Sequence, residues 1–383
     1  MLLLASTASG RTRAVMRMAR ELSLGMSFFR GAVSLEQQLD GPLRRIVLLT
    51  TRDLDAASVD VLLRAAGNTP FGLVVSASRE VLRLRNQDRL LDELQQLGNV
   101  AWLGMRYSAD ELAQAARDCR RGLLRLSRQE LEHAFAGEQL ALHYQPKVEH
   151  SDARAWRTQE VEALLRWNHP RHGCLAAPEF LPELEEFGLA ARVGDWALRE
   201  AARQLVAWRE QGLAVNACIN LASSLLADPF LPDTCERIVT ASGLACSNFT
   251  FEVIEQDIAG SDAPHLATLN ALRARGFRIS LDHFGIAAAS LGTLERLPVD
   301  EIKIHAAALA RARQSDVGQK ILAAVTGLAH NLGISVCADG VEDEATRGFL
   351  KIIECDRMQG LLISPAVLPE VIRSRYGPAE AVA

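Results

Sequence analysis

Short apolar runs alternate with amphipathic segments over residues 1 to about 125. The runs have the length of buried strands, and the segments between them have the apolar spacing of helices. Strands that alternate with helices predict a parallel sheet covered on both faces, with ligands bound at the carboxyl ends of the strands. The predicted strands are residues 1–5, 26–29, 46–49, 71–75 and 100–105, and the predicted helices include residues 11–22, 56–66 and 108–125.

From residue 139 onward a different repeat begins, in which a short β-type run precedes a longer helical pattern. Eight such runs in roughly 240 residues predict a (β/α)₈ barrel of the TIM type. They are residues 140–148, 161–167, 215–221, 249–254, 277–281, 301–304, 334–338 and 358–363. We therefore expect an α/β protein with a flavodoxin-like, doubly wound domain over residues 1–125 and a barrel over residues 139–383.

The two halves are joined by residues 126–138, and apolar positions from 117 to 135 predict one long amphipathic helix around this linker. Such a helix can transmit rotation or dimer geometry between domains. It can equally serve as a spacer that packs one face, and the sequence favours neither role.

The composition mainly argues against certain classes of protein. The 383 residues carry a formal net charge of -5, which does not suit a nucleic-acid-binding domain. The seven cysteines are widely spaced and form no C-x-x-C pair, so reduced thiols in a cytoplasmic protein are expected. The apolar start is short and is followed, not preceded, by Arg11 and Arg13, unlike a secretory signal. No apolar run is long enough to predict a membrane span.

Polar side chains stand on or just after most of the eight predicted barrel strands, where barrels place their active sites. One such acid alone is more often a helix cap or an ion-pair partner. Four oxygen donors on four strands, with a lysine and an arginine nearby, predict a phosphate and metal site for Mg²⁺ or Mn²⁺. The set is Gln145, Glu162, Arg166, Asn220, Glu252, Glu255, Asp282, Lys303, Asp339, Glu342 and Gln359.

The second half resembles the EAL-domain phosphodiesterases, which hydrolyse cyclic di-GMP to the linear dinucleotide. Residues 162–167 read EALLRW, which is similar to the family signature. Further motifs follow in family order: YQPK at 144–147, INL at 219–221, FEVIE at 251–255, IKI at 302–304, ADGVE at 338–342 and QG at 359–360. The resemblance implies two-metal hydrolysis of a phosphodiester, cyclic di-GMP as ligand and a homodimer.

The resemblance also implies a role for each matching residue. Glu162, Asn220, Glu252 and Asp282 would hold the first metal, and Lys303 would orient the attacking water. Arg166 would bind a phosphate of the ligand through its guanidinium fork. Gln145 and Gln359 would position the water, a metal or the ligand, whereas Glu255 and Glu342 would support the loop after the fifth strand.

Several positions depart from the family pattern. His283 stands where the family has the second aspartate, a ligand of the second metal, and Mg²⁺ prefers oxygen to imidazole donors, whereas Mn²⁺ or Zn²⁺ tolerates nitrogen. The loop residues Thr, Gly and Tyr are replaced at 286–288, and Asp339 is shorter than the family glutamate. His305, Ile254 and Leu361 replace an aspartate, a threonine and a tyrosine. Loss of one metal would cost roughly 4 kcal/mol, or ~10³ in rate.

The first half resembles a response-regulator receiver in pattern but not in chemistry. The first strand is followed by Ala5-Ser6-Thr7 instead of paired acids, the third ends in Leu49-Thr50 instead of an aspartate, and the fifth ends in Met105-Arg106 instead of a lysine. Asp53 suits a helix N-cap. Since acyl-phosphate chemistry needs a carboxylate nucleophile and magnesium-binding acids, we expect this domain to serve in dimerisation or partner docking.

Three functions stay open on this basis. The leading hypothesis is a catalytically impaired EAL protein that acts as a cyclic di-GMP receptor or through an unidentified protein partner, because hydrolysis depends more on the second metal than binding does. The alternative is a weak or manganese-preferring phosphodiesterase. The third is an interaction module without a nucleotide site, although such a module has no reason to keep so many site residues.

Overall fold

The computed structural model describes residues 2–6, 25–39, 45–50, 56–66, 71–76, 93–94, 99–103, 111–112, 114–116, 118–119, 124, 126–149, 158–258, 263–285, 294 and 296–377. The chain divides into two compact units. One comprises Met1–Leu140 with Trp167–Leu184, and the other comprises Ala141–Arg166 with Glu185–Ala383. No described helix is long and apolar enough to cross a bilayer.

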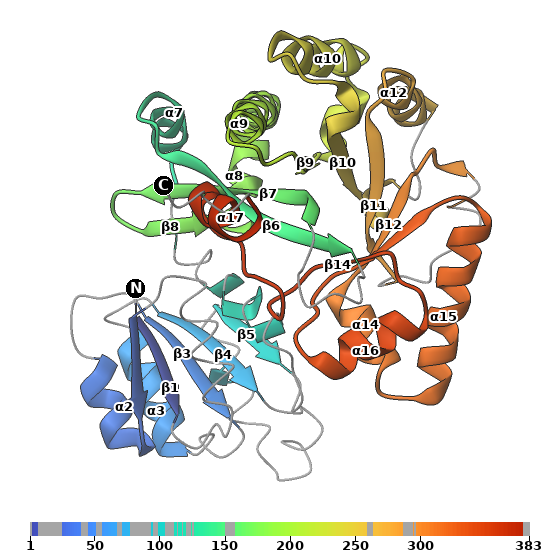
Figure 1. The fold of residues 1–383 in the computed structure, drawn as a ribbon. Helices are drawn as coiled ribbons and strands as arrows, with labels where there is room; N and C mark the ends of the chain where they lie inside the picture. Colours follow the sequence, from blue (N-terminus) through green and yellow to red (C-terminus); the bar gives the residue numbers. More distant parts are fainter. Residues whose placement is uncertain are drawn as a thin grey trace, which may run out of the picture. The chain divides into compact units, whose positions relative to one another are not determined.

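The first unit contains a five-stranded parallel sheet in the order β2-β1-β3-β4-β5, of which Figure 1 labels β1, β3, β4 and β5. Its strands are β1 (Leu2–Ser6), β2 (Gly25–Phe29), β3 (Arg45–Thr50), β4 (Phe71–Ser76) and β5 (Val100–Leu103). This order is that of the flavodoxin-like fold, so the predicted class is confirmed. Helices α2 (Gly31–Leu39) and α3 (Ala56–Ala66) follow β2 and β3; α2 was not among the predicted helices.

Alternation along β3 explains why both faces of this sheet are covered. Ile46 and Leu48 lie in one buried apolar cluster, whereas Val47 and Leu49 lie in another. Successive side chains on a strand point to opposite faces, so a continuous apolar run requires packing on both sides. Leu49 is fully buried at the end of β3, where a receiver would carry its phosphoacceptor. The predictions on residues 11–22, Asp53 and Met105-Arg106 lie outside the described residues.

The prediction of one helix from 117 to 135 is wrong. Leu124, Leu126 and Ser127 are not helical, and helix α7 covers only Arg128–Ala136. Ser127 is its N-cap: the hydroxyl accepts from the Glu130 amide at 3.3 Å, and the Glu130 carboxylate accepts from the Ser127 amide at 2.9 Å. This reciprocal capping box ends the preceding segment, and its S-x-x-E pattern is visible in the sequence.

The predicted barrel is confirmed as a closed ring of eight strands. In order around the ring, the strands are β6 (Leu140–Glu149), β14 (Arg357–Met358), β13 (Ser335–Ala338), β12 (Glu301–Ile304), β11 (Arg278–Phe284), β10 (Phe249–Ile254), β9 (Asn216–Asn220) and β7 (Thr158–His169), which also pairs with β6. The short strand β8 (Gly173–Ala176) extends β7 as a ninth strand that was not predicted. Gly173, the first residue of β8, has φ +71°, a conformation that suits glycine directly after the turn from β7.

Two strands differ from an all-parallel barrel of equal strands. β6 runs antiparallel to β14, with Met358 opposite Val148. β14 is only two residues long, shorter than the predicted run to residue 363, because the chain turns at Gly360. Backbone bonds from Leu362 to Val341 and from Ile363 to Gly360 hold that turn.

Helices surround these strands (Figure 1). The longest, α9 (Ala190–Glu210), buries Leu198, Ala202, Leu205 and Trp208 at helical spacing. The Trp208 ring meets Tyr144 edge-on at 4.8 Å, and its indole N–H donates to the Pro369 carbonyl. Among the described residues, this half also contains the helices α8 (Leu181–Glu186), α10 (Leu231–Ala241), α11 (Glu255–Ile258), α12 (Ala263–Ala274), α14 (Ala306–Ala312), α15 (Asp316–Asn331), α16 (Glu344–Ile352) and α17 (Pro369–Tyr376), with 3-10 turns at Ala177–Glu179, Ser223–Ala227 and Cys246–Asn248.

Candidate functional site

The Glu162 side chain on β7 brings together three of the predicted site residues. The Asn220 amide at the end of β9 donates to Glu162 Oε1 at 2.8 Å. Lys303 Nζ from β12 and Gln359 Nε2, which follows β14, both donate to Glu162 Oε2 at 2.7 Å. Residues up to 197 positions apart therefore converge on one carboxylate, and Asn220 lies at the carboxyl end of its strand, where barrels form active sites.

Lys303 also binds the second central acid. Its Nζ lies 3.0 Å from Glu252 Oε2 on β10, and the Lys303 side chain is only 2% exposed. Burial opposes ionisation of Glu162, yet Lys303 holds its pKa below the usual value. By contrast, burial and the Glu162 carboxylate raise the pKa of Glu252. The Lys303 ammonium thus contacts both carboxylates, yet the pKa of Glu162 is lowered and the pKa of Glu252 is raised.

Asp282 and His283 occupy an irregular point of β11. The register with β12 shifts between Leu281 and Phe284, and His283 has φ +61°. A non-glycine residue in this region costs of order 1–3 kcal/mol and often marks a functional position. Asp282 Oδ1 accepts from the His283 amide at 2.7 Å. Asp282 is close enough to Lys303 and Glu252 to act on the charge of both.

His283 lies beside a second imidazole. The rings of His283 and His305 meet edge-on with centroids 4.6 Å apart. His305 caps α14, and its Nδ1 accepts from the Ala307 amide at 3.1 Å. Burial and the neighbouring His283 lower the pKa of His305. A neutral ring that accepts at Nδ1 carries its proton at Nε2, so His305 offers no lone pair to a cation in this arrangement.

Gln145 lies on β6, the strand that runs antiparallel to β14, and is linked to Glu162 through Gln359. Gln359 Nε2 donates to Gln145 Oε1 at 2.9 Å, and Gln145 Nε2 donates to the Ser364 carbonyl at 3.0 Å. The backbone of Gln359 is fixed as well, because its amide donates to Ala338 and its carbonyl accepts from Val341. The segment that contains Glu342 is thereby tied to the Gln359 turn.

Three further predicted residues have other partners. Glu255 begins α11 and its carboxylate accepts from the Gly285 amide directly after β11, while burial raises its pKa. Arg166 on β7 donates to the Leu165 carbonyl, and together with burial its charge lowers the pKa of His143. Asp339 follows β13 and acts on the charge of Lys303. The replaced loop at 286–288 lies outside the described residues.

A second layer of charged side chains was not predicted as part of the site. Lys147 Nζ lies 2.6 Å from Glu252 Oε1, 3.0 Å from Glu301 Oε1 and 3.6 Å from Glu160 Oε2. Arg357 lies 2.7 Å from Glu301 and 3.4 Å from Glu160. A signal for this layer exists in the sequence, because Glu160, Glu301 and Arg357 each precede a predicted site residue by two positions and so point to the same face.

The residues present fit one hard cation. Glu162, Glu252 and Asp282 supply carboxylate oxygens, and because the Asn220 Nδ2 atom donates to Glu162, the side-chain carbonyl oxygen of Asn220 is the atom left for a cation. The buried Gln359 Oε1 has no hydrogen-bond donor among the described residues, and a nearby water or cation would satisfy it. Within the described ranges, no three His, Cys, Asp or Glu side chains are already arranged as a metal site. The donor set therefore fits a first cation, whereas a second would depend on His283.

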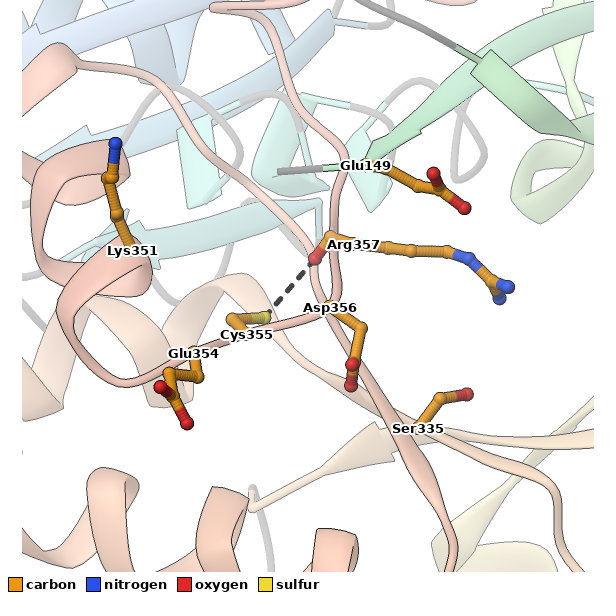
Figure 2. A pocket seen from close by; sticks show the side chains of 7 residues that line it. All are labelled: Glu149, Ser335, Lys351, Glu354, Cys355, Asp356 and Arg357. Carbon is orange, nitrogen blue, oxygen red and sulfur yellow. Dashed lines mark hydrogen bonds between the residues drawn. The ribbon is translucent and has the colours of Figure 1, made fainter. Parts of the chain in front are cut away.

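A hollow of about 590 Å³ lies at the other ends of the strands. It is lined by Glu149, Ser335, Lys351, Glu354, Cys355, Asp356 and Arg357 (Figure 2). Ser335 and Arg357 are the first residues of β13 and β14, and the Cys355 thiol donates to the Arg357 carbonyl at 3.2 Å. The hollow thus lies at the face opposite the carboxyl strand ends where barrels form active sites, and Arg357 reaches from it to Glu301.

Comparison with known proteins identifies the barrel. The EAL domain model matches residues 128–366. The bifunctional diguanylate cyclase/cyclic di-GMP phosphodiesterase MucR of Pseudomonas aeruginosa is 36% identical over 235 residues, which are 61% of this chain and 34% of that protein. The cyclic di-GMP phosphodiesterase PdeR of Escherichia coli is 29% identical over 251 residues, 64% of this chain and 37% of that protein. The chain spans about a third of the length of these relatives.

Solved structures agree with this match. The PaMucR phosphodiesterase in its c-di-GMP complex is 35% identical, has a TM-score of 0.59, and the match covers 64% of this chain and 98% of that chain. The FimX EAL domain from Pseudomonas aeruginosa bound to c-di-GMP is 21% identical with a TM-score of 0.54, covers 61% of this chain and 93% of its own, and supports the fold alone. The family model covers more than half of the residues, and this chain therefore belongs to the EAL domain family.

Proposed function

We propose that the barrel binds cyclic di-GMP and is impaired in its hydrolysis, so that the chain acts as a receptor in cyclic di-GMP signalling. The ligand is inferred from MucR and PdeR, both of which are named as cyclic di-GMP phosphodiesterases, and from the c-di-GMP complex of PaMucR. The impairment is inferred from this chain's own residues.

One observation carries the proposal: the position after Asp282 is an imidazole that packs on another imidazole, 4.6 Å away. His305 presents no lone pair, since its Nδ1 is used by Ala307. His283 alone would therefore replace the oxygen ligand of the second metal, and Mg²⁺ does not favour nitrogen. This replacement should lower the rate of hydrolysis more than the affinity for cyclic di-GMP, because the metals act mainly on the transition state.

The first cation would be held by Glu162, Asn220, Glu252 and Asp282. When bound, a divalent cation supplies Lewis-acid polarisation of a phosphoryl oxygen. Lys303 holds the Glu162 and Glu252 carboxylates in place at 2.7 and 3.0 Å. Gln359 links Glu162 to Gln145, and Arg166 would bind a phosphate of the ligand through its guanidinium.

The test is calorimetry with cyclic di-GMP in Ca²⁺, followed by chromatography of the same mixture after incubation with Mg²⁺ or Mn²⁺. We expect binding with intact nucleotide in Mg²⁺, and faster formation of the linear dinucleotide by His283→Asp. His305→Ala, which removes the neighbouring ring without adding an oxygen ligand, is the matched control and should not raise turnover. Rapid hydrolysis by the wild type in Mg²⁺ would overturn the proposal.

A second candidate is a manganese-preferring phosphodiesterase. The observation in its favour is the connected set Glu162, Asn220, Lys303 and Glu252, which includes the predicted water-orienting lysine. Mn²⁺ accepts an imidazole ligand more readily than Mg²⁺ does. This candidate requires turnover in Mn²⁺ that is lost in His283→Ala, and absence of the linear dinucleotide in Mn²⁺ would exclude it.

For the amino-terminal half we propose a role in assembly, with domain limits at 1–125, 126–138 and 139–383. Support comes from the flavodoxin-like strand order combined with Leu49-Thr50 at the end of β3, where a receiver needs an aspartate. Light scattering on the full chain and on residues 126–383 tests this role. A homodimer that persists unchanged without residues 1–125 would contradict it.

A further inference from the structure

The barrel interior holds two successive layers of polar side chains. Glu162, Glu252, Lys303 and Gln359 form the layer of the candidate site. Residues two positions earlier on three of the same segments point the same way: Glu160 on β7, Glu301 on β12 and Arg357 on β14. On the reversed strand β6 the order is inverted, so that Gln145 belongs to the site layer and Lys147, two positions later, to the layer beneath.

Lys147 is the direct link between the layers. Its side chain is fully buried, and its Nζ binds Glu252 Oε1 at 2.6 Å in one layer and Glu301 Oε1 at 3.0 Å in the other. The opposite oxygen of the same carboxylate, Glu252 Oε2, faces Lys303 at 3.0 Å. Each oxygen of Glu252 therefore has its own ammonium, which fixes both the position and the rotation of the carboxylate.

Lys147 is itself held in place from the second layer. Glu301 Oε1 accepts from both Lys147 and the Ser280 hydroxyl, at 3.0 and 2.8 Å, while Arg357 binds Glu301 Oε2 at 2.7 Å. Buried carboxylates of this kind need partners that satisfy their remaining lone pairs. The second layer thus acts as a rigid support for one ammonium rather than as a separate site.

We infer that Lys147 is a positioning residue for the first cation: it holds Glu252 Oε1 so that Oε2 stays directed at the site layer. This inference rests on the proposed cation ligands. It assigns Lys147 no contact with the ligand and no part in proton transfer. Its consequence is that the affinity for a divalent cation depends on a side chain outside the ligand set.

The test measures Mn²⁺ binding to the full chain by calorimetry and by the electron paramagnetic resonance signal of free Mn²⁺. Lys147→Met alone would remove one of the positive charges that offset the buried carboxylates Glu160, Glu252 and Glu301, which destabilises a fold. The informative variant is Lys147→Met with Glu301→Gln, because it removes one charge of each sign and keeps the wild-type net charge. Glu301→Gln alone is the matched control, since it retains the Lys147–Glu252 contact.

We expect the double variant to bind Mn²⁺ at least about tenfold more weakly than the wild type and the control to stay within about threefold. Wild-type affinity in a folded double variant would overturn the role of Lys147 and leave the cation site intact. No Mn²⁺ binding by the wild type would overturn the cation site and this role together. If the double variant does not fold, Lys147→Met with Glu301→Met, an apolar pair of similar volume, answers the same question.

Discussion

Gly360 offers a direct test of how the site is supported. This residue follows Gln359 and has φ +149°, a conformation that side chains with a Cβ rarely adopt. A Cβ built on Gly360 would lie 2.2 Å from the Val341 amide nitrogen and 2.4 Å from the Val341 carbonyl oxygen. Both are backbone atoms, so Gly360→Ala can be accommodated only if the two segments move apart.

The expected cost follows from two effects. A sparsely populated backbone conformation costs roughly 1–3 kcal/mol, and forced overpacking costs typically about 1–3 kcal/mol. A loss of about 3 kcal/mol would lower the Tm of a domain of this size by roughly 6–12 °C. Since the Val341 amide donates to the Gln359 carbonyl, the same movement would displace the Gln359 amide from Glu162 and weaken ligand binding.

The assay is thermal unfolding followed by circular dichroism, with Gly327→Ala as the matched control. Gly327 lies within α15, and a Cβ there would meet nothing within 4 Å. Alanine in a helix interior is favoured over glycine by about 1 kcal/mol, so the control should be neutral or slightly more stable. Equal Tm values for Gly360→Ala and the wild type would refute the close-approach argument.

Three further predictions concern other parts of the chain. Ser127→Ala should lower the unfolding free energy by about 1 kcal/mol, measured by urea denaturation, because it removes the N-cap of α7; Ser127→Asp should retain it. Burial opposes the charge of Glu301, but Lys147 and Arg357 lower its pKa to about 2. The ionised form of Glu301 therefore contributes stability that is complete above pH 4.5, its ordinary pKa, and is lost as pH falls toward 2. Glu301→Gln should lose unfolding free energy less steeply than the wild type between these pH values. An unchanged dependence of the unfolding free energy on pH would contradict the assignment. Mn²⁺ at 100 times its Kd should stabilise the wild type by about 2.7 kcal/mol, an increment that EDTA reverses and that Glu162→Gln reduces; a metal-independent Tm would contradict the cation site.

The amino-acid sequence predicts more of the site than of its support. The motif residues Glu162, Asn220, Lys303 and Gln359 were predicted from their positions on strand ends, and they are in contact. The strand bounds agree for β10 and β12, where apolar and polar residues alternate as they do in a strand. The S-x-x-E pattern of the capping box at Ser127 is present in the sequence. The predicted helix is nevertheless too long, because the apolar periodicity continues across Ser127.

What only the tertiary structure decides is which strands are neighbours and in which direction they run. The sequence contains Lys147 in a motif, but its contact with Glu301, 154 positions away, depends on the reversal of β6 and on closure of the ring. The contact of His283 with His305 likewise depends on the bulge in β11 and on the start of α14. Alternation along a strand is a local property of the backbone and can be predicted from sequence, whereas pairing around a barrel depends on register between distant segments, which no local pattern encodes.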